Sequence, residues 1–194
     1  MPTSLVLTPR RFARHDWAPM TDAEWAGLAT LVAPAQGAAG RRPVDPRRLW
    51  DAIFWVACSS GPWREMPEAL GKPGTVHRAL CRHARAGLLD RLLVGLSSPA
   101  LATRLGSLAW RIARAWRRVA RLMRLGQLLM AKRLGLLSAL PCAPDFLPRP
   151  DLSERAMLYG RILFRGPWNR PLHRYLRLLL RMMAGDRRQW RLTD

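Results

Sequence analysis

Apolar side chains in this chain recur at the three- and four-residue intervals of an α-helix, in short segments separated by proline and glycine. No segment shows the alternation of apolar and polar residues that a half-buried strand requires. The first segment predicts a helix over residues 22–32, and four apolar residues share one of its sides: Trp25, Leu28, Leu31 and Val32. Thr21 and Glu24, three residues apart, form a capping-box pattern at its start. The periodicity therefore predicts an all-α protein.

Four further helices are expected before residue 97. Asp45 is a suitable N-cap and Pro46 a suitable first residue for a helix that ends near Ser59. A short helix is predicted over 63–70, followed by a turn at 71–74 that is dense in helix breakers. Thr75 is then expected to cap a helix over 76–86, and a last helix is expected over 88–96.

The chain changes character after a candidate boundary at residues 97–100. Arginines repeat at seven-residue intervals over 101–137, opposite an apolar face, which predicts a long basic amphipathic helix with a break at Gly126 or Gly135. The proline-rich segment 141–150 is expected to be a linker, and helices are expected over 152–164 and 171–184. The predicted organisation is a basic leader (1–19), a helical domain (20–97), the basic helix (98–140), the linker, and a C-terminal helical segment (151–194).

The charge of the chain constrains its partners more than its fold. The 194 residues carry a formal net charge of +20 and a pI near 11.8. An excess this large indicates an anionic partner, which is double-stranded DNA or, as the alternative, an anionic membrane surface. Almost all the cations are arginines, which suit bidentate contacts to phosphate and guanine, although a GC-rich genome would produce the same bias.

Several classes of protein do not fit the sequence. Three cysteines without a CxxC pair predict neither a disulfide framework nor a zinc site, and they favour a reducing cytoplasm. No secretory signal and no uncharged apolar run of membrane-spanning length is present. The four histidines do not combine with cysteines or acids at metal-ligand spacing, so neither a metal site nor a cofactor is expected.

The segment 63–86 has the order of a helix-turn-helix: a short helix, a turn, and a second helix that is basic near its start. In such a unit the second helix enters the major groove. Spacing alone favours a plain helical bundle with a solvated basic face, because helix pairs of this kind are common. The residues predicted from this order to contact DNA are Arg41, Arg42, Arg47, Arg48, Thr75, His77, Arg78, Arg82 and Arg85.

Several ordered motifs over residues 20–96 resemble the N-terminal helical domain of bacterial insertion-element transposases. They read TDAEW, GRRPVD before an apolar helix, GPWREMP, GTVHR, and RAGLLDRLL. By this resemblance, Trp63, Arg64 and Glu65 match the family's tryptophan-arginine-acid motif, which adds Arg64 to the residues predicted to contact DNA. The stretch 75–78 matches its threonine-valine-aromatic-arginine motif, with His77 in place of the aromatic residue. The family also tends to have a Pro-Trp pair at 72–73 and aromatic residues at 80 and 83. The resemblance implies a module that reads DNA ends.

The same resemblance implies a nuclease domain after the helical domain, and the sequence does not fit one. Such a nuclease needs three carboxylates on a mixed sheet to hold two metal ions. The acids beyond residue 97 are Asp145, Asp151, Glu154, Asp186 and Asp194, and none follows a strand-like apolar run. We therefore expect no catalytic residues and a truncated or diverged transposase relative that binds DNA without being an enzyme.

Two alternatives remain open at the level of sequence. The arginine-, tryptophan- and leucine-rich segment 101–137 also suits a helix that lies in a membrane interface. A decayed reading frame, whose C-terminal half has no evolved function, would have the same arginine-, leucine- and proline-rich texture.

Overall fold

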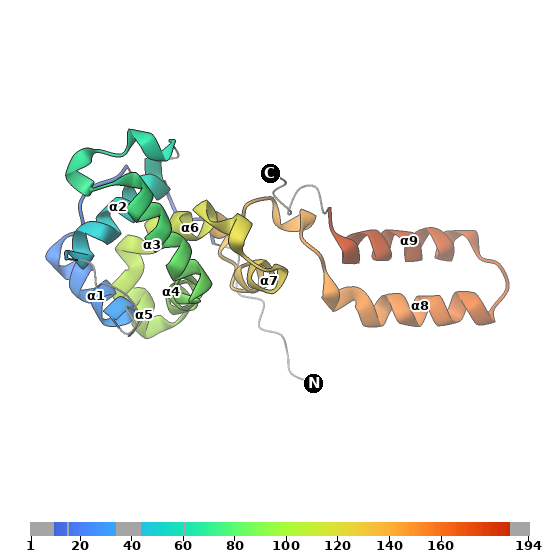
Figure 1. Ribbon diagram of the computed structural model, residues 1–194. Coiled ribbons are helices and arrows are strands. Elements are labelled where there is room, and N and C mark those ends of the chain that lie inside the picture. Colours follow the sequence, from blue (N-terminus) through green and yellow to red (C-terminus); the bar gives the residue numbers. More distant parts are fainter. Residues whose placement is uncertain (1–9, 15, 34–43, 60, 187–194) are drawn as a thin grey trace. The chain divides into compact units, whose positions relative to one another are not determined.

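The computed structural model describes residues 10–14, 16–33, 44–59 and 61–186 (Figure 1). These residues form an all-α fold, as predicted, and their only β-type pairing is an isolated bridge between Arg10 and Leu136. The chain divides into two compact units, Met1–Leu140 and Pro141–Asp194. The first unit contains α1 (Asp22–Val32), α2 (Pro46–Ser59), α3 (Pro73–Arg85), α4 (Leu88–Ser97), α5 (Pro99–Leu105), α6 (Ala109–Arg118) and α7 (Leu125–Arg133). The second contains α8 (Ser153–Arg165) and α9 (Arg170–Ala184).

Local capping signals fix the starts of the first two helices, as the sequence predicted. At α1, the Glu24 amide donates to Thr21 Oγ1 at 3.2 Å, and the Thr21 amide donates to Glu24 Oε2 at 2.9 Å, so the capping box is confirmed. At α2, the Arg48 amide donates to Asp45 Oδ1 at 2.9 Å. Each bond satisfies a backbone N–H that has no partner within its own helix.

Helix α2 is the centre of the first unit. Most of its side chains are buried, among them Trp50 and Phe54, both at 0% exposure. Helix α6 packs against α2, and its residues Ile112, Ala113 and Trp116 are also fully buried. A helix that is apolar on most sides needs neighbours on most sides, and the first unit supplies α3 and α6 around α2.

The segment between α2 and α3 differs from the prediction. Residues 63–70 form two 3-10 turns, Trp63–Glu65 and Glu68–Leu70, in place of the expected short α-helix. Pro62 and Pro67 each stand directly before one of these turns, and proline restricts its neighbours too strongly for one continuous helix. Helix α3 begins at Pro73 with Lys72 as its N-cap residue, so the prediction that Thr75 caps it was wrong. Thr75 lies within the first turn of α3.

The single amphipathic helix expected over 101–137 is also absent. The chain there forms α5, the 3-10 turn Gly106–Leu108, α6, the 3-10 turn Ala120–Leu122, and α7. These pieces pack into the first unit: α5 contacts α1 and α4, and α6 contacts α2 and α4. At the contact with α1, a Cβ atom on Gly27 would lie 3.0 Å from the Arg104 carbonyl oxygen. Residues 98–140 therefore belong to the same compact unit as the helices before them, not to a separate part beginning near residue 97.

The second unit is a hairpin of α8 and α9, which run antiparallel in Figure 1. Its small core consists of Leu152, Ala156 and Leu179, and the rings of Tyr159 and Tyr175 meet edge-on with centroids 4.9 Å apart. The predicted linker 141–150 contains a 3-10 turn at Pro144–Phe146 and the start of another at Pro150–Leu152. Eight large apolar side chains of this hairpin remain exposed: Met157, Leu158, Ile162, Phe164, Trp168, Tyr175, Leu178 and Leu180.

Candidate nucleic-acid interface

Helix α3 separates its apolar and basic side chains onto opposite faces. Val76, Ala79, Leu80 and Ala84 are buried against the first unit. Five residues predicted to contact DNA lie on the exposed face: Thr75, His77, Arg78, Arg82 and Arg85. Because residues three, four and seven positions apart share a helix face, Arg78, Arg82 and Arg85 form one row of guanidinium groups. The structure therefore brings half of the predicted contact residues together on one helix.

The exposed face of α3 is shallowly hollowed. A depression of about 470 Å³ is lined by six residues, all from this helix: Thr75, His77, Arg78, Cys81, Arg82 and Arg85. Because no other element among the described residues walls this hollow, the exposed face of α3 is open to a partner. Such a surface suits a partner with a groove, which can take in the helix, better than a small molecule that needs enclosing walls.

Aromatic contacts hold His77 at the start of this face. The Trp63 ring meets the His77 ring edge-on, with centroids 4.9 Å apart. On its other side, His77 Nε2 lies 3.6 Å from Cys81 Sγ. The guanidinium of Arg118, at the end of α6, lies 5.7 Å from the centroid of the Trp63 ring and donates to the Gly61 carbonyl at 2.5 Å. Trp63 therefore connects α6 to α3.

His83, by contrast, faces the core. Its ring stacks on Trp50 with centroids 5.4 Å apart and planes inclined by 17°. Burial, and to a lesser extent the neighbouring Arg82 cation, lowers the pKa of His83 to about 4. A neutral, stacked imidazole is a packing residue.

The remaining predicted contact residues do not form one group. Arg47 is held at the start of α1: its Nη1 lies 2.6 Å from Asp22 Oδ1, and its Nη2 donates to the Met20 carbonyl at 2.5 Å. Arg48, in the first turn of α2, and Arg64, in the first 3-10 turn after it, are exposed. Arg41 and Arg42 lie outside the described residues.

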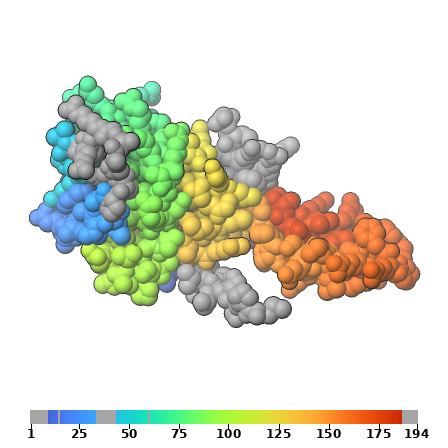
Figure 2. All heavy atoms as spheres, turned by 60° about the horizontal axis from the view of Figure 1, so that its bottom comes forward, coloured from blue at the N-terminus to red at the C-terminus, as the bar shows by residue number. Residues whose placement is uncertain are grey.

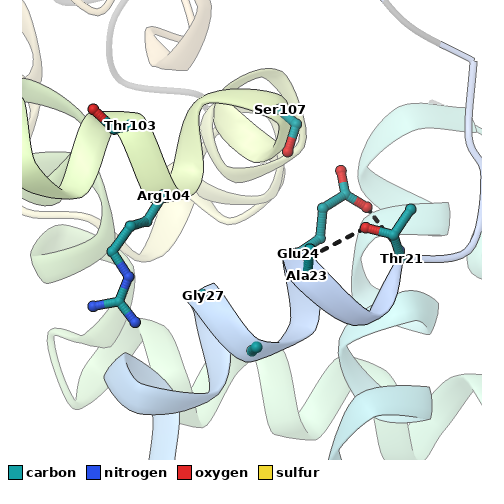
Figure 3. Close-up of a pocket in the computed structure, with 8 residues that line it drawn as sticks. Thr21, Ala23, Glu24, Gly27, Thr103, Arg104 and Ser107 are labelled. Carbon is teal, nitrogen blue, oxygen red and sulfur yellow. Dashed lines mark hydrogen bonds between the residues drawn. The ribbon is translucent and has the colours of Figure 1, made fainter.

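A second hollow of about 680 Å³ lies between α1 and the segment 103–107 (Figure 3). Its lining includes Thr21, Glu24, Thr103, Arg104 and Ser107. Glu24 is engaged in the capping box and in an ion pair with Arg111 at 3.7 Å, both side chains being nearly buried at 13% and 11% exposure. Sequence reasoning missed this ion pair, because 87 positions separate its partners and no local pattern connects them. The carboxylate of Glu24, which lines this hollow, therefore has a structural role.

Two further observations concern the described residues as a whole. Nowhere among them do three His, Cys, Asp or Glu side chains meet where they could hold a metal ion. Within the same residues, no single helix has the length and apolar character to cross a membrane. Only α4 together with Pro99–Arg118 reaches those limits, as a pair bent by 107°.

The N-terminal helices resemble a known protein family. Residues 20–93 match a family model described as "Putative transposase of IS4/5 family". We call this matched segment, residues 20–93, the transposase-like domain. The resemblance predicted for residues 20–96 is therefore confirmed, and this domain includes α1, α2, α3 and most of α4.

The transposase-like domain also has a curated relative. An uncharacterized protein of Sinorhizobium fredii is 35% identical over 82 residues, which are 42% of this chain and 65% of the relative. The match thus spans slightly less than two thirds of the relative's length. No solved structure matches the chain. The core partner of the domain, α6, lies beyond the matched residues.

Proposed function

We propose that this protein binds double-stranded DNA through α3, in the manner of a recognition helix in the major groove. The observation that carries the proposal is the division of α3 into a buried apolar face and an exposed face that carries Thr75, His77 and three arginines. The match of residues 20–93 to a transposase family supports it, because α3 lies inside the matched segment.

The chemistry of the exposed face suits both parts of DNA recognition. An arginine fork can donate two hydrogen bonds to guanine O6 and N7, which distinguishes guanine from the other bases. Arg78 stands one residue after His77 in the N-terminal half of α3, the part of a recognition helix that reaches base edges. Arg82 and Arg85, one and two turns later, are placed to contact phosphates or further bases.

The arrangement before α3 refines the proposed binding unit. A typical helix-turn-helix has a turn of three or four residues, whereas α2 and α3 are separated by residues 60–72 with two 3-10 turns. We propose that α2 and α3 form the helix pair, in place of the predicted segment 63–70 and α3. In this arrangement Trp63 supports His77 from the connection.

We further propose that this chain binds DNA without cutting it. Asp151 pairs with Arg149 at 2.9 Å beside the start of α8, and the described acids beyond residue 97 lie in helical or loop segments. The purified protein is expected to leave supercoiled plasmid intact in magnesium or manganese. Metal-dependent nicking that is abolished by Asp151→Asn or Glu154→Gln would contradict this proposal.

The test of the α3 proposal uses a duplex selected from a random library by the full-length protein. Arg78→Ala is expected to reduce the preference for that duplex over a random one by about 1–3 kcal/mol. Arg48→Ala, an exposed arginine on α2, is the matched control and should weaken binding to both duplexes alike or not at all. An unchanged preference in a folded Arg78→Ala variant would refute the role of α3.

A second function is favoured by the exposed apolar residues of the α8–α9 hairpin. Seven arginines and one acid, Glu154, accompany them on these two helices. Exposed apolar side chains beside many cations are typical of helices that lie on an anionic membrane, where arginine heads reach the lipid phosphates. The same excess of positive charge disfavours a second copy of the hairpin as partner. We propose anionic membrane binding by α8–α9.

The site of this alternative differs from the one expected from the sequence. The apolar face of α6, within 101–137, is buried against α2 and α4 and is not available to a membrane. Flotation with phosphatidylserine-containing vesicles should be lost in an Ile162→Ser, Leu178→Ser variant and retained in Val94→Ser, an exposed apolar residue of α4. Equal flotation with neutral vesicles, or none with anionic ones, would exclude this function.

A further inference from the structure

The end of α6 and the turn after it concentrate arginines beside α3. Arg114, Arg117, Arg118 and Arg121 fall within eight residues, and no acid stands between Asp90 and Asp145. The turn Ala120–Leu122 contacts α3. In Figure 2 the green surface over α3 and α4 borders the yellow surface of the chain that follows α6.

These arginines differ in how the fold uses them. Arg114 Nε donates to the Ala57 carbonyl at 3.2 Å, and its guanidinium lies 5.5 Å from the centroid of the Trp110 ring. Arg118 is held by Trp63 and the Gly61 carbonyl. Arg117 and Arg121, one turn apart, are exposed to solvent. The first pair is partly buried, and the side chains of the second pair are exposed at the surface.

The charges of this group repel one another. Burial lowers the pKa of Arg114, and the cations of Arg117, Arg118 and Arg14 lower it further, while Cys58 acts in the opposite direction. Burial and Arg121 likewise lower the pKa of Arg118. Gathering like charges costs stability in the isolated protein, and a polyanion laid across them would relieve that cost.

We propose that Arg117 and Arg121 bind backbone phosphates of the same DNA duplex whose bases α3 reads. This inference rests on the proposed function of α3 and adds a second, sequence-independent contact from outside the transposase-like domain. The link Arg118–Trp63–His77 gives the spatial connection, because it joins the arginine group to the exposed face of α3. Arg118 is a positioning residue, and Arg117 and Arg121 make the contact.

The test compares the salt dependence of duplex binding in the full-length protein. Each phosphate contact contributes a slope of about −0.9 to the plot of log affinity against log salt. Arg117→Ala combined with Arg121→Ala should therefore make the slope shallower by about 1.8 on both the selected and a random duplex. The preference for the selected duplex should not change, because phosphate contacts carry no base information.

Two further variants distinguish a phosphate contact from a general loss of charge and from a folding defect. Arg161→Ala with Arg165→Ala, an exposed pair of the same spacing on α8, removes equal charge and should leave the slope unchanged. Arg117→Lys with Arg121→Lys keeps both charges and should restore most of the slope, which a purely structural defect would not allow.

The outcomes separate this inference from the function of α3. Three results would each overturn the inference without contradicting the proposed role of α3. They are a wild-type salt slope in the Arg117, Arg121 double variant, an equal loss of slope in the α8 control, and a lost preference of the double variant for the selected duplex. A failure of the lysine variant to recover any slope would also overturn it. If the unaltered protein binds neither duplex, the proposed function fails and this inference fails with it.

Discussion

At the scale of single residues, two histidines of one helix have opposite environments. His77 is exposed and held against Trp63, whereas His83 is half-buried and stacked on Trp50. Helical spacing accounts for this difference, because His83 lies seven residues after Val76 and three after Leu80, on the same helix face. The support of His77 by Trp63 was not predictable, because it depends on the path of the chain through residues 64–72. Local spacing determines which side a residue faces, and tertiary packing determines what it meets there.

The buried imidazole of His83 should make folding stability depend on pH. Its pKa falls from 6.5 to about 4 in the folded protein because of burial and Arg82. Below pH 6.5 the unfolded chain binds a proton that the folded protein does not bind, so this contribution to stability declines from pH 6.5 down to about 4. Urea unfolding between pH 6.5 and 4 should show a loss of stability in the wild type that is smaller in His83→Phe. An equal loss in both would contradict a lowered pKa of His83, and His77→Phe serves as the exposed control.

At the scale of secondary-structure elements, the sequence predicted helices best where local signals are complete. The bounds of α1 agree with the prediction at both ends. The helical periodicity begins at the capping box and ends just before Pro34. The single helix predicted over 101–137 was wrong, because the apolar periodicity continues through two 3-10 turns, Gly106–Leu108 and Ala120–Leu122. Leu105 at the end of α5, Leu108 in the first turn and Ala120 in the second are all buried. The positions at which the helix is interrupted depend on packing against α1, α2 and α4, which local periodicity does not report.

The two threonines that resemble N-caps provide a direct test at this scale. Thr21→Ala should destabilise the protein by about 0.5–2 kcal/mol, because the Glu24 amide loses its acceptor. Thr75→Ala should change stability by less than about 0.5 kcal/mol, since Thr75 is an exposed residue inside α3 and not its cap. Equal losses in the two variants, measured by urea unfolding, would show that Thr75 has a capping role after all.

Asp90 joins three helices and should matter more than its partly exposed position suggests. Trp116 Nε1 on α6 donates to its Oδ1 at 2.8 Å, and Gln127 Nε2 on α7 donates to its Oδ2 at 2.6 Å. Asp90→Ala leaves the N–H of a fully buried tryptophan without an acceptor, at a cost of about 1–3 kcal/mol in unfolding free energy. Asp90→Asn keeps an acceptor and should lose less, and Asp145→Ala is the exposed control. A loss no greater than that of the control would refute the role of Asp90.

At the scale of the whole molecule, the boundary near residue 97 was placed by a change in composition, and the structure does not divide there. Composition marks where arginine becomes dense, but a boundary depends on where contacts stop. Helix α6 lies beyond residue 97 and packs against α2, and its Trp116 is fully buried. A family match that ends at residue 93 therefore marks the extent of sequence similarity and not the extent of the core.

This argument leads to a test with two fragments. Residues 1–140 include every helix of the first unit and should unfold in one cooperative transition, with a midpoint in urea close to that of the full chain. Residues 1–97 lack α5, α6 and α7, so α2 loses its contact with α6, and the buried Ile112 and Trp116 are missing from the core. The loss of several large core side chains, each worth about 2–5 kcal/mol, exceeds the stability of most small domains.

The shorter fragment should therefore lack a cooperative transition by circular dichroism, and it should bind DNA without preference. Cooperative unfolding of residues 1–97, with the preference for the selected duplex intact, would show that the transposase-like domain folds without α6 and would place the boundary back at residue 97.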